Sequence, residues 1–247
     1  MSVLLRTFNR NFQFFKTSLE GVIRKLDAAA NVQLPATWVQ DPTRTTNDSC
    51  VVIKPSEPIC LTGISQKGNS RSKKISVFLD GHITLRSKDK RKVRMSNYGT
   101  KLLYCIPRKS VDLSSLKVSG GFHFDFDINT QPAHPVFHMQ HDNSVLVDKI
   151  DELKHVHTLE PLDGENRFFR IPTAQMDILS TLIMIIADHF VDKDQAIQCE
   201  EFSKLIHEVE QFLVDADFQP SSHLKPFNGY LEQFPHLNSI SWYCEVR

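Results

Sequence analysis

Every second residue between positions 122 and 127 is phenylalanine, in the run Phe-His-Phe-Asp-Phe-Asp. Side chains of a β-strand point alternately to its two faces, so this run predicts a strand with Phe on one face and His or Asp on the other. The aromatic face is expected to belong to the core. The face of His and Asp is the strongest candidate in the chain for a functional site.

Alternating patterns extend from about residue 50 to residue 141 and predict an antiparallel sheet. The dipeptide Asp80-Gly81 is favoured in type I′ turns, and residues 87–90 also have the composition of a turn. Alternation places Ile83 and Leu85 toward the core. The strands are expected at 75–79, 82–86, 91–95, 102–106, 118–127 and 136–141, with Pro107 ending the fourth.

The N-terminal segment has a helical period instead. Its large apolar residues recur at alternating spacings of four and three, which is typical of a helix packed along another helix. We expect a helix over about residues 3–30, and Leu34-Pro35 then stops it. Three heptads are short for an autonomous coiled coil, so docking on the protein's own body is favoured over a dimer seam. The pattern consists of Phe8, Phe12, Phe15, Leu19, Val22 and Leu26.

The C-terminal part of the chain returns to the helical period. A helix over residues 174–190 is apolar on nearly all sides and is expected to be buried at the centre of the fold. A second helix, over about 195–216, is amphipathic. Alternation over residues 240–247 predicts a strand that closes the sheet.

Together these patterns predict an α+β fold. An antiparallel sheet, built as a meander of hairpins, is expected to pack against a buried central helix and flanking amphipathic helices. The 247 residues are enough for a sizeable core, and we expect one domain over 1–247. Its sub-regions are an N-terminal helix in 1–33, the antiparallel sheet in 50–148, and a helical layer with the closing strand in 172–247.

The composition is that of a globular protein, with 40% hydrophobic and 23% charged residues. The five cysteines are far apart and form no CxxC pair, which indicates reduced thiols in a cytoplasmic protein. Polar residues such as Arg6 and Arg10 interrupt the N-terminal apolar residues, so a secretory signal is not expected. The longest apolar run, 178–187, is far too short to span a bilayer. We therefore expect a cytoplasmic protein with no membrane association.

Charge is distributed unevenly, although the formal net charge is zero. Residues 66–109 contain thirteen Lys or Arg and two Asp, a local charge of +11 that leaves −11 for the rest of the chain. Such a surface suits a nucleic-acid backbone or an acidic partner, and it also fits solvated hairpins with basic turns. The residues expected to bind a nucleic-acid substrate are Arg86, Lys88, Lys90, Arg91, Lys92 and Arg94.

The candidate site follows from pairing strand 122–127 with strand 136–141 as an antiparallel hairpin. The simplest register that brings their polar residues to one face sets Asp125 opposite His138 and His123 opposite Gln140. An Asp–His pair at this separation could orient an imidazole as a general base. The same residues could instead hold a divalent metal ion. We assign the catalytic role to His123, Asp125 and His138.

Two further residues are candidates for metal binding. Asp127 shares the polar face of its strand, and His134 lies in the loop between the two strands, from which it could reach the site. His141 falls on the opposite face from His138 and is expected to be structural. The simpler alternative is an amphipathic hairpin whose polar face is merely solvated, although Asp and His are uncommon in strands.

The sequence motifs of several enzyme classes are absent. The chain contains no P-loop, dinucleotide-binding GxGxxG, HExxH, GxSxG elbow or kinase motif. The alternating aromatic, His and Asp strand, followed by His-Pro-x-x-His, resembles poorly characterised His-rich bacterial proteins, including toxins of the TumE-like type in toxin-antitoxin and phage-defence neighbourhoods. The resemblance covers residues 122–141. It implies an activity that damages RNA or DNA, with His123, Asp125, His134 and His138 at the site.

Two functions therefore remain open. In the first, the basic strands hold a nucleic acid while the His and Asp face supplies a base or a metal for phosphodiester cleavage. In the second, the protein is a non-enzymatic nucleic-acid-binding or assembly subunit that binds a protein partner, or a second copy, through the N-terminal helix. The two differ in whether the basic strands and the His and Asp face border one cleft.

Overall fold

The fold is described from a computed structural model. For residues 65, 86–89, 92–97, 108–109, 112–115, 126, 137, 171–172, 207–215 and 219–220 the description covers the backbone alone. The described residues are 2–27, 30–44, 50–65, 74–89, 92–109, 112–126, 137–142, 145–150, 171–172, 176–191, 195–215 and 219–220.

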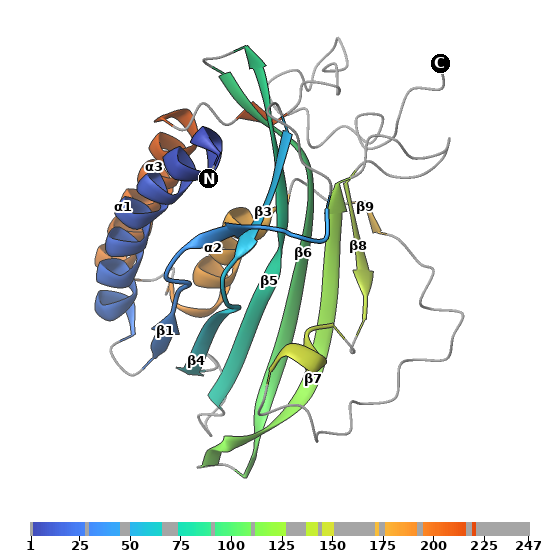
Figure 1. Cartoon of the computed structure of the whole chain (residues 1–247). Coiled ribbons are helices and arrows are strands. Elements are labelled where there is room, and N and C mark those ends of the chain that lie inside the picture. Colours follow the sequence, from blue (N-terminus) through green and yellow to red (C-terminus); the bar gives the residue numbers. More distant parts are fainter. Residues whose placement is uncertain are drawn as a thin grey trace.

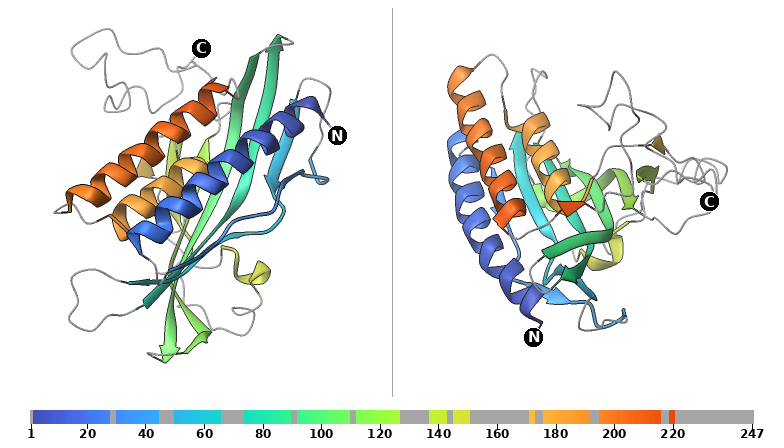
Figure 2. Two further views of the ribbon diagram at one scale, coloured as in Figure 1. Left: turned by 90° about the vertical axis from the view of Figure 1, so that its left-hand side faces the viewer. Right: turned by 90° about the horizontal axis from the view of Figure 1, so that it is seen from above.

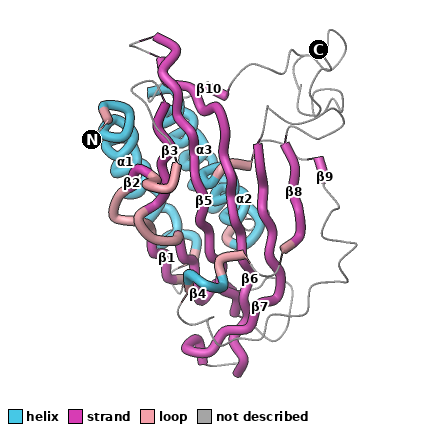
Figure 3. The backbone as a smooth tube through the Cα atoms, turned by 45° about the vertical axis from the view of Figure 1, so that its right-hand side comes forward, coloured by secondary structure: helices cyan, strands magenta, loops and turns pink. Residues whose placement is uncertain are grey.

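The strands form one sheet (Figure 1), which contains the predicted segments between residues 50 and 141 and also short strands that were not predicted, at 31–33, 38–40, 171–172 and 219–220. Its hydrogen-bonded order is β1-β4-β5-β6-β7-β8-β9, while β3 joins β5, β2 joins β3, and β10 runs parallel to β6 (Figure 3). All other pairings are antiparallel. The strands are β1 (Asn31–Gln33), β2 (Trp38–Gln40), β3 (Cys50–Pro55), β4 (Ile59–Ser65), β5 (Lys74–Asp89), β6 (Lys92–Lys109), β7 (Asp112–Phe126), β8 (Phe137–His141), β9 (Ile171–Pro172) and β10 (Gln219–Pro220).

Three helices cover one face of this sheet (Figure 2). They are α1 (Val3–Leu26), α2 (Ile178–His189) and α3 (Ala196–Asp215). Helix α2 packs on β5 and β6, while α1 lies along α3 and contacts β2 and β3. The α+β class, the buried central helix and the flanking amphipathic helices are thus confirmed.

The N-terminal helix docks on the protein's own body, as its spacing favoured. All six residues of its apolar pattern are buried, and Phe12 has no exposed surface. The rings of Phe8 and Phe12 lie edge-on to Trp38 of β2, at centroid distances of 4.9 and 5.7 Å. Asn9 donates from its side-chain amide to the Trp38 carbonyl oxygen and accepts from the Trp38 N–H, which ties the helix to the sheet.

Helix α2 begins at Ile178, four residues later than expected. The carboxylate of Asp177 accepts hydrogen bonds from the backbone N–H groups of Leu179 and Ser180, at 3.0 and 3.3 Å, and so acts as the N-cap. The two residues of β9, at 171–172, pair with β8 instead of leading into the helix. None of the described helices combines the length and apolar character that crossing a membrane requires.

The prediction of a hairpin turn at Asp80-Gly81 is wrong, because β5 runs without interruption through both residues. Gly81 pairs with Thr100, and its φ of +149° is in the range that favours glycine. A Cβ at Gly81 would collide with the backbone oxygen of Gly99. The glycine therefore serves a close approach of two strands, a common reason for glycine within a sheet, and sheet pairing overrides the local turn preference.

Strand β6 is also longer than the sequence suggested. It includes residues 92–95 and 102–106, which were predicted as parts of separate strands, and continues past Pro107, which pairs with Leu116 beside a register shift. Ser87 pairs with Val93, so the expected turn at 87–90 starts too early. Proline is tolerated where the ladder is irregular, which explains why it does not end the strand. The strand predicted at 240–247 lies outside the described residues.

The face of the sheet opposite the helices carries a smaller apolar cluster. The short 3₁₀ helix η1 (Val147–Lys149) and its flanks cover part of this face (Figure 2). The cluster consists of Phe78, Leu103, Cys105, Leu116, Val118, Val145, Leu146 and Ile150. Beside this cluster the same face becomes polar, and that polar region contains the candidate site.

Candidate functional site

The predicted register of β7 and β8 is confirmed. Asp125 pairs with His138, and His123 pairs with Gln140. Asp125 Oδ2 lies 3.4 Å from His123 Nε2 and 3.8 Å from His138 Nε2. One carboxylate oxygen therefore faces two imidazole nitrogens, one from its own strand and one from the neighbouring strand.

These three side chains form a cluster that could hold a metal ion. One potential ligand atom from each of His123, Asp125 and His138 lies within 4.8 Å of the others. Tetrahedral ligands with bonds of about 2.1 Å are separated by roughly 3.4 Å, so the cluster needs only a small contraction to coordinate an ion. The His138 side chain is buried, whereas 40% of the Asp125 side chain is exposed. The site thus has a buried inner side and an open outer side.

The alternation in β7 explains why the cluster forms on this face. Phe124 is buried against the helical layer, on the opposite side of the sheet from His123 and Asp125. His141 packs edge-on against Phe122 at a centroid distance of 5.5 Å, on that same opposite side. The structural role expected for His141 agrees with this contact.

A cavity of about 680 Å³ opens beside the cluster. His123 and Asp125 form part of its wall, and strands β5 and β6 extend that wall across the sheet. The volume is within the range typical of small-molecule sites. The remaining lining residues are Asp41, Thr43, Arg44, Lys54, Asp80, Gly81, His82, Gly99, Lys101, Asp142, Val145, Leu146, Asp148 and Lys149.

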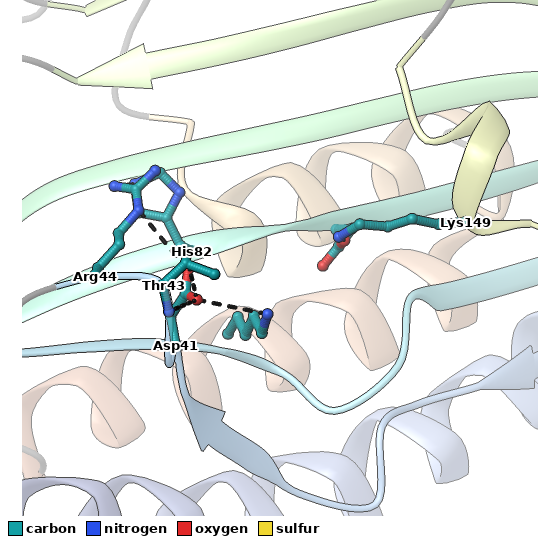
Figure 4. A network of polar contacts seen from close by, with 7 residues as sticks. Asp41, Thr43, Arg44, His82 and Lys149 are labelled. Carbon is teal, nitrogen blue, oxygen red and sulfur yellow. Dashed lines mark hydrogen bonds and ion pairs between the residues drawn. The ribbon is translucent and has the colours of Figure 1, made fainter.

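One side of the cavity is a polar network that follows β2 (Figure 4). Asp41 Oδ1 accepts hydrogen bonds from the Thr43 N–H and hydroxyl, at 3.1 and 2.8 Å. Lys54 Nζ and Arg44 Nε lie 3.6 and 3.7 Å from the same carboxylate. Burial raises the pKa of Asp41, but the Thr43 hydrogen bonds and the two cations outweigh burial and lower it. Asp41 is therefore a charged anchor for this loop.

On the other side of the cavity, Lys149 of η1 forms an ion pair with Asp80 of β5 (Figure 4). The Asp80 side chain is almost entirely buried, while about half of the Lys149 side chain is exposed. This pair joins η1 to the sheet at the point where the apolar cluster gives way to the polar cavity.

The structure brings together His123, Asp125 and His138. The other predicted metal ligands, Asp127 and His134, lie outside the described residues. The same holds for Lys90 and Arg91. The side chains of the other expected substrate-binding residues, Arg86, Lys88, Lys92 and Arg94, are also outside the description, which covers only their backbone in β5 and β6.

Sequence reasoning missed several residues of the cavity wall, above all His82 and Gly99. The turn predicted at Asp80-Gly81 separated His82 from the strand that contains Phe78 and Asp80. A continuous β5 would have placed all three on one face by alternation. His82 pairs with Gly99, and Gly99 pairs with Asp125, so residues of three strands lie in one row beside the cluster.

Comparison of the chain with protein-family models, with curated proteins and with solved structures finds no match.

Proposed function

We propose that the protein is a metal-dependent phosphodiesterase that acts on nucleic acid, with His123, Asp125 and His138 as the metal ligands. The observation that carries the proposal is the convergence of three ligand atoms within 4.8 Å at the wall of the cavity. Two imidazoles and one carboxylate are a donor set suited to Zn²⁺ or Mn²⁺.

Three protein ligands leave further coordination positions for water and substrate, as in catalytic metal sites. The exposed side of Asp125 and the adjoining cavity provide room for both. A divalent ion held by these residues would lower the pKa of a bound water and polarise a phosphoryl oxygen. In the reaction, a water molecule loses a proton as its oxygen bonds to phosphorus, the bond between phosphorus and the leaving oxygen breaks, and the leaving oxygen takes up a proton.

Lys101 is the described cation closest in register to the cluster, because it pairs with His123 across β6 and β7. Its side chain is exposed and lines the cavity, where it is available to contact a phosphate. The described lining as a whole contains five Asp and four Lys or Arg, so the cavity is not strongly basic. Affinity for a polyanion would therefore come mainly from the basic stretch 66–109.

A role as a toxin or in phage defence belongs to the same proposal and is supported by the resemblance of residues 122–141 alone. The competing function is a non-enzymatic nucleic-acid-binding or assembly subunit, for which the uneven charge of the chain is also sufficient.

The experiment that separates the two functions measures cleavage of labelled single- and double-stranded RNA and DNA. The wild-type protein is assayed with Mg²⁺, Mn²⁺ or Zn²⁺ and with EDTA, beside the double variant His123→Ala/His138→Ala. His141→Ala is the matched control, because His141 lies in β8 like His138 but on the opposite face of the sheet.

We expect metal-dependent cleavage by wild type and by His141→Ala, and loss of cleavage with retained binding in the double variant. Binding without cleavage by the wild-type protein under every metal condition would favour the subunit function. Cleavage that persists in EDTA but disappears in the double variant would instead indicate a general base without a metal.

A further inference from the structure

Gly99 occupies the centre of a cross-strand row, between His82 of β5 and Asp125 of β7. A Cβ at this position would lie 2.6 Å from His82 Cε1, 3.1 Å from His82 Nδ1 and 3.1 Å from Asp125 Oδ1. The first distance is far shorter than a normal carbon–carbon contact of about 3.5 Å. The absence of a side chain at Gly99 therefore leaves the space between His82 and Asp125 open, although no hydrogen bond or ion pair joins these two described side chains across it.

The two oxygens of the Asp125 carboxylate face different neighbours. Oδ2 is the oxygen near the Nε2 atoms of His123 and His138. Oδ1 is the oxygen on the side of Gly99. It lies 3.1 Å from the position that a Cβ at Gly99 would occupy, and His82 Nδ1 lies at the same distance from that position. A carboxylate divided in this way can offer one oxygen to a metal ion and the other to a hydrogen-bond donor.

The hydrogen bond made by Nε2, the second ring nitrogen of His82, determines which ring nitrogen carries the proton. Arg44 Nη1 lies 2.8 Å from His82 Nε2. A guanidinium group has only donors, so Nε2 accepts this hydrogen bond and the proton of the neutral ring is on Nδ1. Arg44 is itself held near Asp41, as Figure 4 shows. The Asp41–Arg44 contact thus presents an Nδ1–H donor on the side of Asp125.

We infer that His82 is a positioning residue of the candidate metal site. With an ion bound at Asp125, its Nδ1–H would donate to Asp125 Oδ1 across the space above Gly99 and so hold Oδ2 toward the metal position. The inference rests on the proposed function, because it assumes that Asp125 binds the ion. His82 itself is not a metal ligand in this arrangement, and Gly99 is the residue whose small size permits the contact.

The test is a calorimetric titration of the full-length protein with Zn²⁺, and separately with Mn²⁺. Loss of outer hydrogen-bond partners typically weakens metal affinity by roughly 10- to 100-fold, and we expect a loss of that size in His82→Ala. His82→Asn should recover part of the affinity, because its amide can donate from nearly the position of Nδ1. Gly99→Ala should weaken binding as well, since the new methyl group forces His82 and Asp125 apart.

Gly120→Ala is the matched control, because Gly120 is also in a strand of the sheet and a Cβ there would meet nothing within 4 Å. Thermal unfolding of each variant separates loss of the fold from loss of the site. If Gly99→Ala does not fold, the comparison of His82→Ala with His82→Asn still decides the question.

Zn²⁺ and Mn²⁺ affinities of His82→Ala and His82→Asn equal to that of wild type would overturn the role of His82 and leave the metal site intact. An equal loss in both variants would also overturn it, because the donor would then not matter. Absence of Zn²⁺ and Mn²⁺ binding by the wild-type protein would overturn the proposed metal site and this inference with it.

Discussion

Asp125 and His138 face each other on neighbouring antiparallel strands, with 3.8 Å between Asp125 Oδ2 and His138 Nε2. His138 is buried, whereas Asp125 is the partly exposed member of the pair. An ion pair with an exposed partner contributes little to stability. The pair alone therefore gives little reason for a carboxylate at this position, which agrees with the ligand role proposed for Asp125.

Replacing Asp125 by Asn should separate binding from folding. Asn keeps the size of the side chain but removes its charge, so the free energy of unfolding should change by less than about 1 kcal/mol. Affinity for Zn²⁺ should fall by more than the roughly 100-fold that loss of an outer-shell partner can produce. Urea unfolding and calorimetry measure the two quantities on the same sample. A large loss of stability with unchanged Zn²⁺ affinity would contradict this prediction.

The packing of α1 can be tested with two phenylalanines of one helix. Phe12 is fully buried beside Trp38, and Phe12→Ala should lower the free energy of unfolding by about 3–5 kcal/mol through the cavity it leaves. Phe14 is 72% exposed, so Phe14→Ala should change the same quantity by no more than about 0.5 kcal/mol. Equal effects in urea unfolding would show that α1 does not dock as described.

A third prediction concerns Asp177, the N-cap of α2. Asp177→Ala removes the acceptor for the N–H groups of Leu179 and Ser180 and should cost about 0.5–2 kcal/mol of stability. Asp177→Asn keeps a capping oxygen and should cost less. Thermal unfolding of the two variants measures the difference, and an equal loss in both would mean that the negative charge of Asp177, not its capping oxygen, is what matters.

The ion pair between Lys149 and Asp80 should be sensitive to loss of the lysine. Lys149→Ala leaves the Asp80 carboxylate buried without this cation, and the expected cost is about 1–3 kcal/mol. The exposed Lys117 of β7 is the matched control, and Lys117→Ala should be nearly neutral. Denaturant unfolding at neutral pH gives both values. Similar values would mean that Asp80 does not depend on Lys149.

The buried Cys105 and the partly buried Tyr104 predict how the free energy of unfolding changes in alkali. Burial raises the pKa of the Cys105 thiol to about 12, and burial together with the charge of Asp188 raises the pKa of Tyr104 to about 12. Ordinary values in an unfolded chain are about 8.5 for Cys and about 10 for Tyr. The contribution of the two groups to the free energy of unfolding is therefore complete below their pKa values in the unfolded chain, and it is lost as the pH rises toward 12. The free energy of unfolding should fall over this range.

The slope of that fall should be smaller in Cys105→Ala and in Tyr104→Phe, because each variant removes one of the two groups. At pH 8 iodoacetamide should modify Cys50 well before Cys105, since the thiolate is the reactive form and Cys105 is buried. Equal labelling rates at the two cysteines would contradict the burial of Cys105.

The sequence by itself was enough for the α+β class, for the helix α1 with its apolar seam, and for the register of β7 with β8. Each rests on short-range periodicity, and a shift of one residue would have moved His123 and Asp125 to the core face. The lengths of β5 and β6 could not be read in this way. Asp80-Gly81 and Pro107 have strong local preferences for turns and strand ends, and only pairing with neighbouring strands overrides them.

Only the tertiary structure decided which residues surround the pair of Asp125 and His138. His82, Gly99 and Arg44 come from three separate segments and meet the site through sheet pairing and through the loop that follows β2. No periodicity connects segments so far apart along the chain. Periodicity assigns a residue to a face, whereas the neighbours across that face depend on strand order, which is set by how the whole chain packs.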